Sequence, residues 1–193
     1  MRVAILLAAG RSRRFGAANK LFARHRGRSL LAHAIGQARR APVQRVIVVV
    51  GAQHRRVAER VRQLDRNAVI VHASDHREGM GASLRAASRR LRTIDREAFV
   101  FLADMPWLPR DMPTRLLRAV RRGDDMLRPI VRGRAGHPVL LRGAGLRSLS
   151  SARGDEGPGR GEFGVRRFVP GDRYCLADVD RPACISHNPP RLR

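Results

Sequence analysis

Arg2-Val-Ala-Ile-Leu-Leu-Ala-Ala-Gly10 is the stretch that decides the fold. Residues 2–8 are almost wholly apolar, and small residues with a glycine follow them. A continuous apolar run of this length indicates a strand that is buried on both faces, as in a parallel sheet covered by helices. The residues that follow, up to Lys20, leave the carboxyl end of that strand. Parallel sheets bind their ligands at this end.

Downstream, apolar strands alternate with amphipathic helices. We expect strands at 45–50, 68–72 and 98–102, and helices at 29–41, 53–64, 82–91 and 109–121. This alternation predicts a single-domain α/β fold, a Rossmann-like three-layer sandwich with a mostly parallel sheet. The last third is less regular. There we expect strands at 127–131 and 138–141, for which antiparallel pairing is open, a mobile glycine-rich loop at 153–164, a last strand at 174–179 and a frayed tail at 189–193.

The composition narrows the possible function classes. The net charge is +24 in 193 residues, which suits an anionic partner. However, the basic residues are spread over every segment, and 39 of the 40 are arginine. This pattern indicates a preference of the whole chain for arginine, so nucleic acid is not the expected partner. It also makes Lys20, the only lysine, informative, because that position needs a compact ammonium group.

The cellular setting follows from what the sequence lacks. No apolar run approaches the ~18 residues of a membrane span, so no membrane partner is expected. The N-terminus lacks the longer apolar region of a signal peptide, and the expected location is the cytoplasm. The two cysteines, Cys175 and Cys184, are interpreted as ordinary thiols.

The loop after the first strand is the first candidate site. It reads Leu7-Ala-Ala-Gly-Arg-Ser-Arg-Arg-Phe-Gly16 and continues to Asn19-Lys20-Leu21. Small residues leaving a buried strand expose backbone N–H groups that bind anions, here the groups around Ala8, Ala9, Gly10, Arg11 and Ser12. Arg14 and Lys20 would add positive charge around a triphosphate. The alternative is a plain strand-to-helix turn with solvated arginines.

Carboxylates at the ends of two later strands are the second candidate. Asp104 closes the expected strand at 98–102, where it could hold a hard cation that bridges phosphates or could cap the next helix. Asp178 and Asp180 close the expected last strand. Because side chains alternate along a strand, only one of these two should reach a metal shared with Asp104. A surface turn is the alternative for this pair.

Six motifs in order resemble those of the MobA-like nucleotidyltransferases, most closely the molybdenum cofactor cytidylyltransferases. The loop 7–21 is similar to the family's L-A-A-G-x-S-x-R-M-G and K-L segments. The other five are Gly79-Met-Gly-Ala-Ser83-Leu, Leu102-Ala-Asp104-Met-Pro, Gly136-His137-Pro-Val-Leu, Gly154-Asp-Glu-Gly157 and Asp178-Val-Asp180-Arg-Pro. Departures include Phe15 for methionine, His76 for tryptophan and Arg181 for threonine.

The resemblance implies a single domain over 1–193 with a nucleotide-diphospho-sugar-transferase-like fold. Its nucleotide-binding half would be about 1–125 and its acceptor-binding half about 126–188. The implied reaction transfers CMP from CTP to a molybdopterin-type cofactor with release of pyrophosphate. Implied catalytic residues are Arg14, Lys20 and Asp104, and Asp104 with Asp180 would hold Mg²⁺. Nucleotide contacts would come from 8–12, Gly79 and Ser83, while His137 would touch the acceptor or order its loop.

Two other functions stay open at this stage. A non-catalytic nucleotide-binding chaperone or insertion partner of a molybdenum hydroxylase could keep the same motifs. An arginine-rich nucleic-acid-binding protein would use the positive charge. The sequence leaves open the acceptor, the choice between CTP and GTP, and the oligomeric state.

Overall fold

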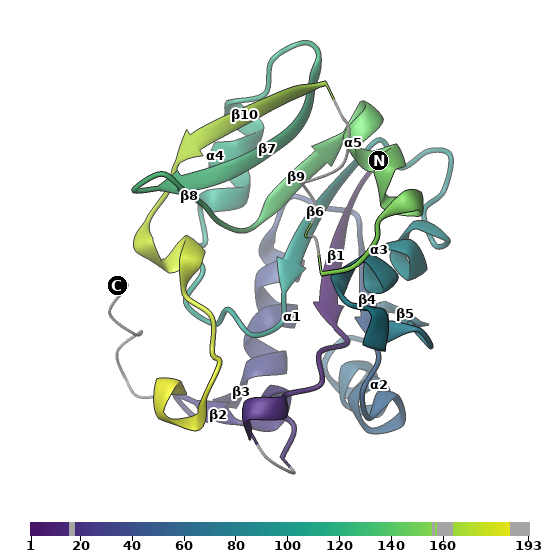
Figure 1. Ribbon diagram of the computed structural model, residues 1–193, viewed down its shortest axis with the longest axis vertical. Coiled ribbons are helices and arrows are strands. Elements are labelled where there is room, and N and C mark those ends of the chain that lie inside the picture. The colour runs from purple at the N-terminus through teal and green to yellow at the C-terminus, as the bar shows by residue number, and fades with distance from the viewer. Residues whose placement is uncertain (16–17, 156, 158–163, 186–193) are drawn as a thin grey trace.

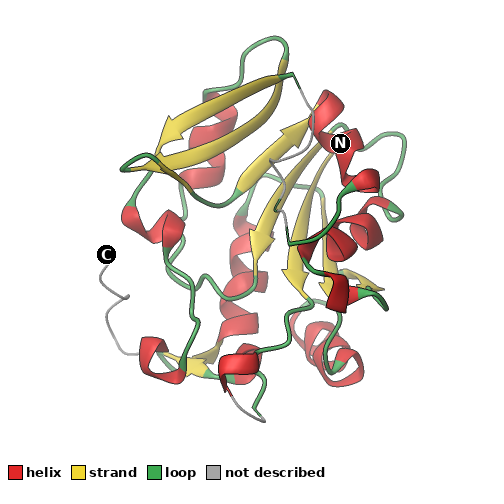
Figure 2. Ribbon diagram, viewed as in Figure 1, coloured by secondary structure: helices red, strands yellow, loops and turns green. Residues whose placement is uncertain are grey.

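The computed structural model describes residues 1–15, 18–155, 157 and 164–185. An α/β sandwich is formed, with a central sheet between two helical layers (Figures 1 and 2). The strands lie in the order β10-β7-β9-β6-β1-β4-β5, and the short β8 pairs with β7. This arrangement confirms the expected single-domain α/β fold with a mostly parallel sheet.

The parallel half of the sheet is built from the apolar strands. β1 (Arg2–Ala8) pairs in parallel with β4 (Arg45–Val50) and with β6 (Glu97–Leu102), and β4 pairs in parallel with β5 (Val69–His72). Alternate residues of β1 enter two separate cores, Ala4 and Leu6 on one face and Val3 and Ile5 on the other. The apolar run at 2–8 therefore reflects burial on both faces.

Helices cover both faces of this half. The first core also contains residues of α1 (Leu30–Arg40), α2 (His54–Leu64) and α4 (Met112–Arg118), and the second core contains residues of α3 (Met80–Ser88). Ser29 caps α1 by accepting the Ala32 N–H at 3.2 Å, and the helix ends before Pro42. α4 is shorter than the expected helix at 109–121, because its first turn begins only where Pro113 can fit.

The remaining strands extend the sheet beyond β6. β9 (Val139–Arg142) is antiparallel to β6 and to β7 (Asp124–Val131), so the pairing left open by the sequence is antiparallel. β8 (Arg134–Ala135) forms a hairpin with β7. A two-stranded hairpin of β2 (Arg24–His25) and β3 (Arg28–Ser29) precedes α1. No helix in these described parts is long and apolar enough to cross a membrane.

The expected last strand at 174–179 is wrong. Asp172 accepts the Tyr174 N–H at 2.8 Å and so caps a 3-10 helix at Arg173–Leu176. The last strand lies earlier in the chain, as β10 (Val165–Pro170), and is parallel to β7. A short helix, α5 (Gly143–Arg147), was also not expected. Of the expected loop at 153–164, residues 156 and 158–163 lie outside the described residues, as does the tail at 189–193.

Candidate active site

A cavity of about 450 Å³ lies at the carboxyl ends of β1 and β6. It gathers most of the site residues that the sequence suggests, although they come from four separate segments. These are Ala8, Ala9, Gly10, Arg11, Ser12, Lys20, Gly79, Ser83 and Asp104. Arg14, His137 and Asp180 do not line it. The cavity occurs where the strand order of a doubly wound sheet reverses, which is the usual ligand site of such folds.

The loop after β1 is fixed by its own polar side chains. Ser12 has a left-handed backbone with φ 51°, and its hydroxyl accepts the Lys20 N–H at 3.1 Å. Asn19 is buried and accepts the Leu21 N–H at 3.0 Å. These bonds close the loop on itself. They aim the side chain of Lys20 into the cavity rather than into solvent.

Lys20 and Asp104 form an ion pair inside the cavity. The Lys20 ammonium lies 2.5 Å from the Asp104 carboxylate, and the two side chains are only 15% and 18% exposed. Lys20 also donates to the Val179 carbonyl at 3.3 Å, and the Val179 N–H donates to the Asp104 carbonyl at 2.9 Å. The C-terminal segment is thereby tied to both residues. A cation and a carboxylate at one end of a small-residue loop form a suitable binding site for a metal-bound phosphate chain.

Asp178 and Asp180 differ in their surroundings. Asp180 pairs with Arg14, and both side chains are about half exposed. Burial raises the pKa of Asp178, and the negative charges of Asp104 and then Asp180 raise it further. Asp178 therefore shares the environment of Asp104, while Asp180 is held by an arginine. The expectation that only one of the two shares a metal with Asp104, and that this one is Asp180, stays a prediction.

Asp104 is a carboxylate of the cavity that a divalent ion could bind. Among the described residues, no group of three histidine, cysteine or acidic side chains is arranged to hold a metal. Asp104 and Asp178 could supply oxygen ligands to such an ion, because the charge of Asp104 is, after burial, the next cause that raises the pKa of Asp178, and a hard cation would offset that repulsion. The residues fit an ion whose remaining ligands are phosphate oxygens and water.

Two glycines at the start of α3, of which Gly79 lines the cavity, allow a close backbone approach. A Cβ on Gly81 would lie 2.6 Å from the Arg153 carbonyl carbon, and the Gly81 N–H donates to the Gly154 carbonyl at 2.8 Å. At Gly79, φ is +115°, and a Cβ would lie 2.5 Å from the Asp155 carboxylate. The chain after α5 is thus packed on the N-terminus of α3, which places Asp155 on the cavity.

Sequence reasoning missed three polar side chains of this cavity. They are His76, Arg77 and Asp155. The motif Gly154-Asp-Glu-Gly157 contains Asp155, so a signal for that residue was present. His76 stands where the family often has tryptophan, whereas Arg77 belongs to no motif. Both residues follow β5, which reaches β1 through its neighbour β4.

His137 lies away from the cavity, at the start of β9. Its N–H donates to the Cys175 carbonyl at 2.8 Å, and its ring Nδ1 is buried without a partner among the described residues. Burial, with a smaller effect of Arg128, lowers the pKa of His137 to about 4. The ring is therefore neutral at pH 7, and whether it orders its loop stays a prediction. Its contact with an acceptor stays a prediction.

Comparisons with known proteins agree with this architecture. The family model of the MobA-like NTP transferase domain matches residues 4–169. Rv0371c from Mycobacterium tuberculosis H37Rv has a similar structure, with TM-score 0.74, 25% identity and 93% coverage of both chains. Its homolog from Mycobacterium sp. strain JC1 has the same score and identity over 95% of this chain and 96% of that chain. A structure of Rv0371c in complex with manganese has TM-score 0.73 and 22% identity, covering 93% of this chain and 92% of that chain. No curated protein matches significantly.

Proposed function

The chain belongs to the MobA-like NTP transferase family, and we propose that it is a magnesium-dependent nucleotidyltransferase that transfers CMP from CTP to a molybdopterin-type acceptor. The observation that carries this proposal is the pairing of Lys20 with Asp104 at 2.5 Å in the cavity formed by the loop after β1. A nucleotidyltransferase needs a cation for the triphosphate and a carboxylate for a metal at one place. Both groups are present there.

The proposed reaction forms one bond and breaks one. An oxygen of the acceptor's phosphate attacks the α-phosphorus of CTP, the bond between the α-phosphorus and the bridging oxygen breaks, and pyrophosphate leaves with the electron pair. Such a transfer depends mainly on alignment and on neutralising charge. Lys20 and Arg11 supply positive charge, and backbone N–H groups of the loop 8–12 hold the phosphates.

Asp104 and Asp178 would hold Mg²⁺ in this proposal. When bound, the ion would neutralise charge on the phosphate chain and on the leaving pyrophosphate. Lys20 would exchange its bond to Asp104 for a phosphate oxygen, while its bond to the Val179 carbonyl could persist. Arg14, now paired with Asp180 at the rim of the cavity, would reach the triphosphate only after that pair opens.

The nucleotide is assigned as CTP from the double alanine, Ala8-Ala9. Both residues are buried, with 2% and 5% of their surface exposed, and both line the cavity. Relatives that use GTP tend to carry glycine at this place in the loop. The acceptor is assigned only from the order of the motifs.

Thermal-shift measurements with CTP, GTP, ATP and UTP, each with and without Mg²⁺, test the proposal. We expect the largest stabilisation from CTP, and only with the metal, because binding to the folded state alone raises the melting temperature. Release of pyrophosphate from CTP in the presence of molybdopterin then tests turnover. A clear preference for GTP would overturn the nucleotide assignment. Nucleotide binding without any pyrophosphate release would identify a non-catalytic binding protein.

A further inference from the structure

A second, open groove lies beside the nucleotide cavity, beyond the carboxyl ends of β4 and β5. It has a volume of about 570 Å³ and shares Arg11, His76 and Arg77 with the nucleotide cavity. Its other walls come from the start of α2 and from the turn after β5, namely Gly51, Ala52, Gln53, His54, His72 and Ser74. Two arginines and three histidines line it, and no acidic residue does.

The three histidines cannot be attributed to the arginine-rich composition. They are three of only seven in the chain, and they reach the groove from three different elements. The rings of His54 and His72 stack with centroids 4.0 Å apart and an interplanar angle of 23°. The Nδ1 atom of His76 lies 3.0 Å from the Ala73 carbonyl, which can only accept, so Nδ1 carries the hydrogen.

The positive groups of the groove are not neutralised by the protein. The nearest acids along the chain, Asp75 and Glu78, both bond to Arg85, at 2.7 and 2.6 Å. Arg11 and Arg77 make no hydrogen bond or ion pair with any residue in the described ranges. Burial lowers the pKa of His72, and the neighbouring His54 and His76 lower it further.

The geometry points to this groove as a second anion site, which binds a phosphate group next to the bound nucleotide. His54, His72 and Ser74 supply directional donors, and Arg11 and Arg77 supply charge. The start of α2 adds backbone N–H groups, because Gln53 makes no side-chain cap. The phosphate can belong to a phosphate monoester, as in a phosphorylated acceptor, or to released pyrophosphate. This inference goes beyond the proposed function and does not depend on turnover.

Calorimetry with His54→Gln/His72→Gln tests the site, since these two histidines line the groove but not the nucleotide cavity. The nucleotide cavity is first filled with Mg²⁺ and a CTP analogue that carries a non-hydrolysable α,β-methylene bond. Inorganic pyrophosphate and glycerol 3-phosphate are then titrated separately. We expect one of them to bind, and the double variant to weaken it about tenfold, the loss from one charge-assisted hydrogen bond. The probe that binds, pyrophosphate or glycerol 3-phosphate, identifies the source of the phosphate.

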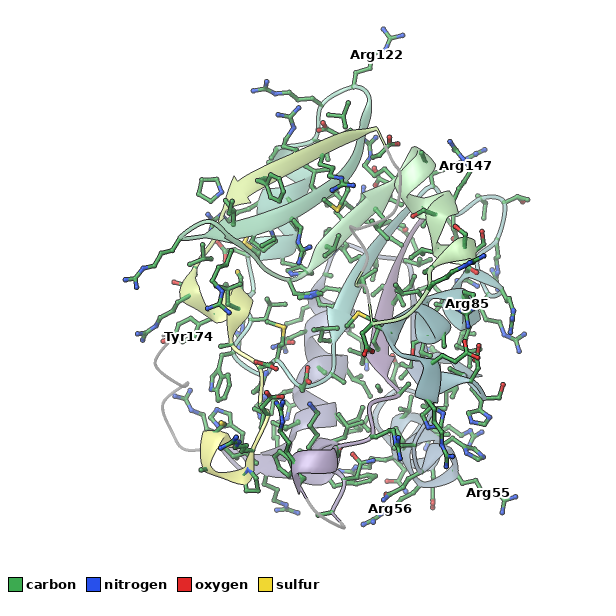
Figure 3. All side chains as sticks on the ribbon, viewed as in Figure 1. Arg55, Arg56, Arg85, Arg122, Arg147 and Tyr174 are labelled. Carbon is green, nitrogen blue, oxygen red and sulfur yellow. The ribbon has the colours of Figure 1, made fainter. Side chains whose placement is uncertain are left out.

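Arg122→Gln/Arg147→Gln is the matched control. Figure 3 shows both arginines pointing outward near the top of the molecule, away from Arg55 and Arg56 of α2, and this variant removes two full charges. If it weakens phosphate binding as much as the histidine variant does, only net charge is involved and the site is refuted. Equal affinities of the parent and of the His54→Gln/His72→Gln variant for the phosphate probe would also refute the site. An equal loss of affinity for the CTP analogue would show that the groove is only part of the nucleotide cavity.

A second measurement covers the case in which the nucleotide analogue does not bind. Imidazole NMR signals of His54 and His72 in the free protein should shift on addition of pyrophosphate or glycerol 3-phosphate, and signals of His33 should not. If neither histidine responds to either probe, the anion site is wrong. A response without any CTP binding would preserve the anion site and refute the proposed nucleotide specificity.

Discussion

The ammonium of Lys20 and the carboxylate of Asp104 meet at 2.5 Å although 84 residues separate them in the chain. Each group follows the end of a strand, and β1 and β6 are direct neighbours in the sheet. The pair therefore depends on strand pairing more than on local sequence. It brings the cation and the metal-binding carboxylate of the proposed reaction to one point.

Asp104→Asn should abolish turnover and leave the protein folded. The amide keeps the size and one acceptor oxygen of the side chain but removes the charge that would hold the metal. We expect a loss of about 100-fold or more in kcat, as for other electrostatic groups at reacting phosphates. Steady-state pyrophosphate release measures it, with circular dichroism for the fold. Glu59→Gln, on the exposed side of α2, is the control. Near-normal magnesium-dependent activity of Asp104→Asn would disprove the metal assignment.

Lys20→Arg should lose activity although the charge is kept. A guanidinium is wider and has a fixed donor plane, so it cannot bond Asp104 and the Val179 carbonyl as the compact ammonium does. We expect a loss of about tenfold or more, which corresponds to about 1.4 kcal/mol of transition-state stabilisation, and a larger loss for Lys20→Ala. Steady-state kinetics of both variants measure the loss of activity. Arg55→Lys, which makes the reverse exchange elsewhere in the chain, is the control. If Lys20→Arg is as active as the parent, the presence of a single lysine at this position has no functional cause.

Gly81→Ala should destabilise the protein, while Gly36→Ala should not. Both glycines lie in helices, α3 and α1. A Cβ on Gly81 meets backbone atoms of Arg153 at 2.6–2.7 Å, whereas on Gly36 it meets only guanidinium ends of Arg40 and Arg28 at 3.5–3.6 Å. We expect a cost of about 1–3 kcal/mol at Gly81 and a gain of about 0.5–1 kcal/mol at Gly36. Urea unfolding compares them, and equal stabilities would contradict the close approach.

Displacing the segment at 153–155 should also weaken nucleotide binding, because this segment places Asp155 on the cavity. The affinity of Gly81→Ala for the CTP analogue should therefore fall, and that of Gly36→Ala should match the parent. If Gly81→Ala is destabilised but binds nucleotide as tightly as the parent, the segment is a structural support and not a wall of the site.

His137 should make stability depend on pH between about pH 6.5 and 4. Its pKa is about 4 in the folded chain and about 6.5 when unfolded, so in this window the unfolded state binds more protons. The contribution of this pKa difference to the free energy of unfolding is complete above pH 6.5. It declines as the pH falls, by about 3 kcal/mol in total. Urea unfolding from pH 7.5 to 4.5 should show a weaker slope for His137→Gln than for the parent. Parallel slopes would contradict the neutral buried ring.

The sequence predicted the parallel core almost to the residue, because its signal is local. The strands at 2–8 and 45–50 have the bounds expected for them, since burial on both faces leaves an unbroken apolar run. Asp104 could be singled out because it follows the end of such a strand, and Lys20 because it is the only lysine in the sequence. The halves assigned as nucleotide-binding and acceptor-binding stay a prediction.

The structure of the C-terminal third was harder to predict from the sequence, because it depends on contacts between distant segments. β10 contains two arginines among mostly exposed residues and follows glycine-rich sequence, so its pairing with β7 leaves little trace in the pattern. α5 contains two glycines, which are poor helix formers. The pairing of Asp180 with Arg14, 166 positions away in the chain, likewise leaves no local signal in the sequence.

The bond from Lys20 to the Val179 carbonyl, 159 residues downstream, also has a consequence for synthesis. On a ribosome that adds about 5–20 residues per second, the anchor at Val179 is made between about 8 and 32 seconds after Lys20. During that interval the nascent chain carries the phosphate loop and, later, Asp104, but not the segment that ties the two together. The contacts of Val179 with Lys20 and with Asp104 therefore form only in the last stage of translation.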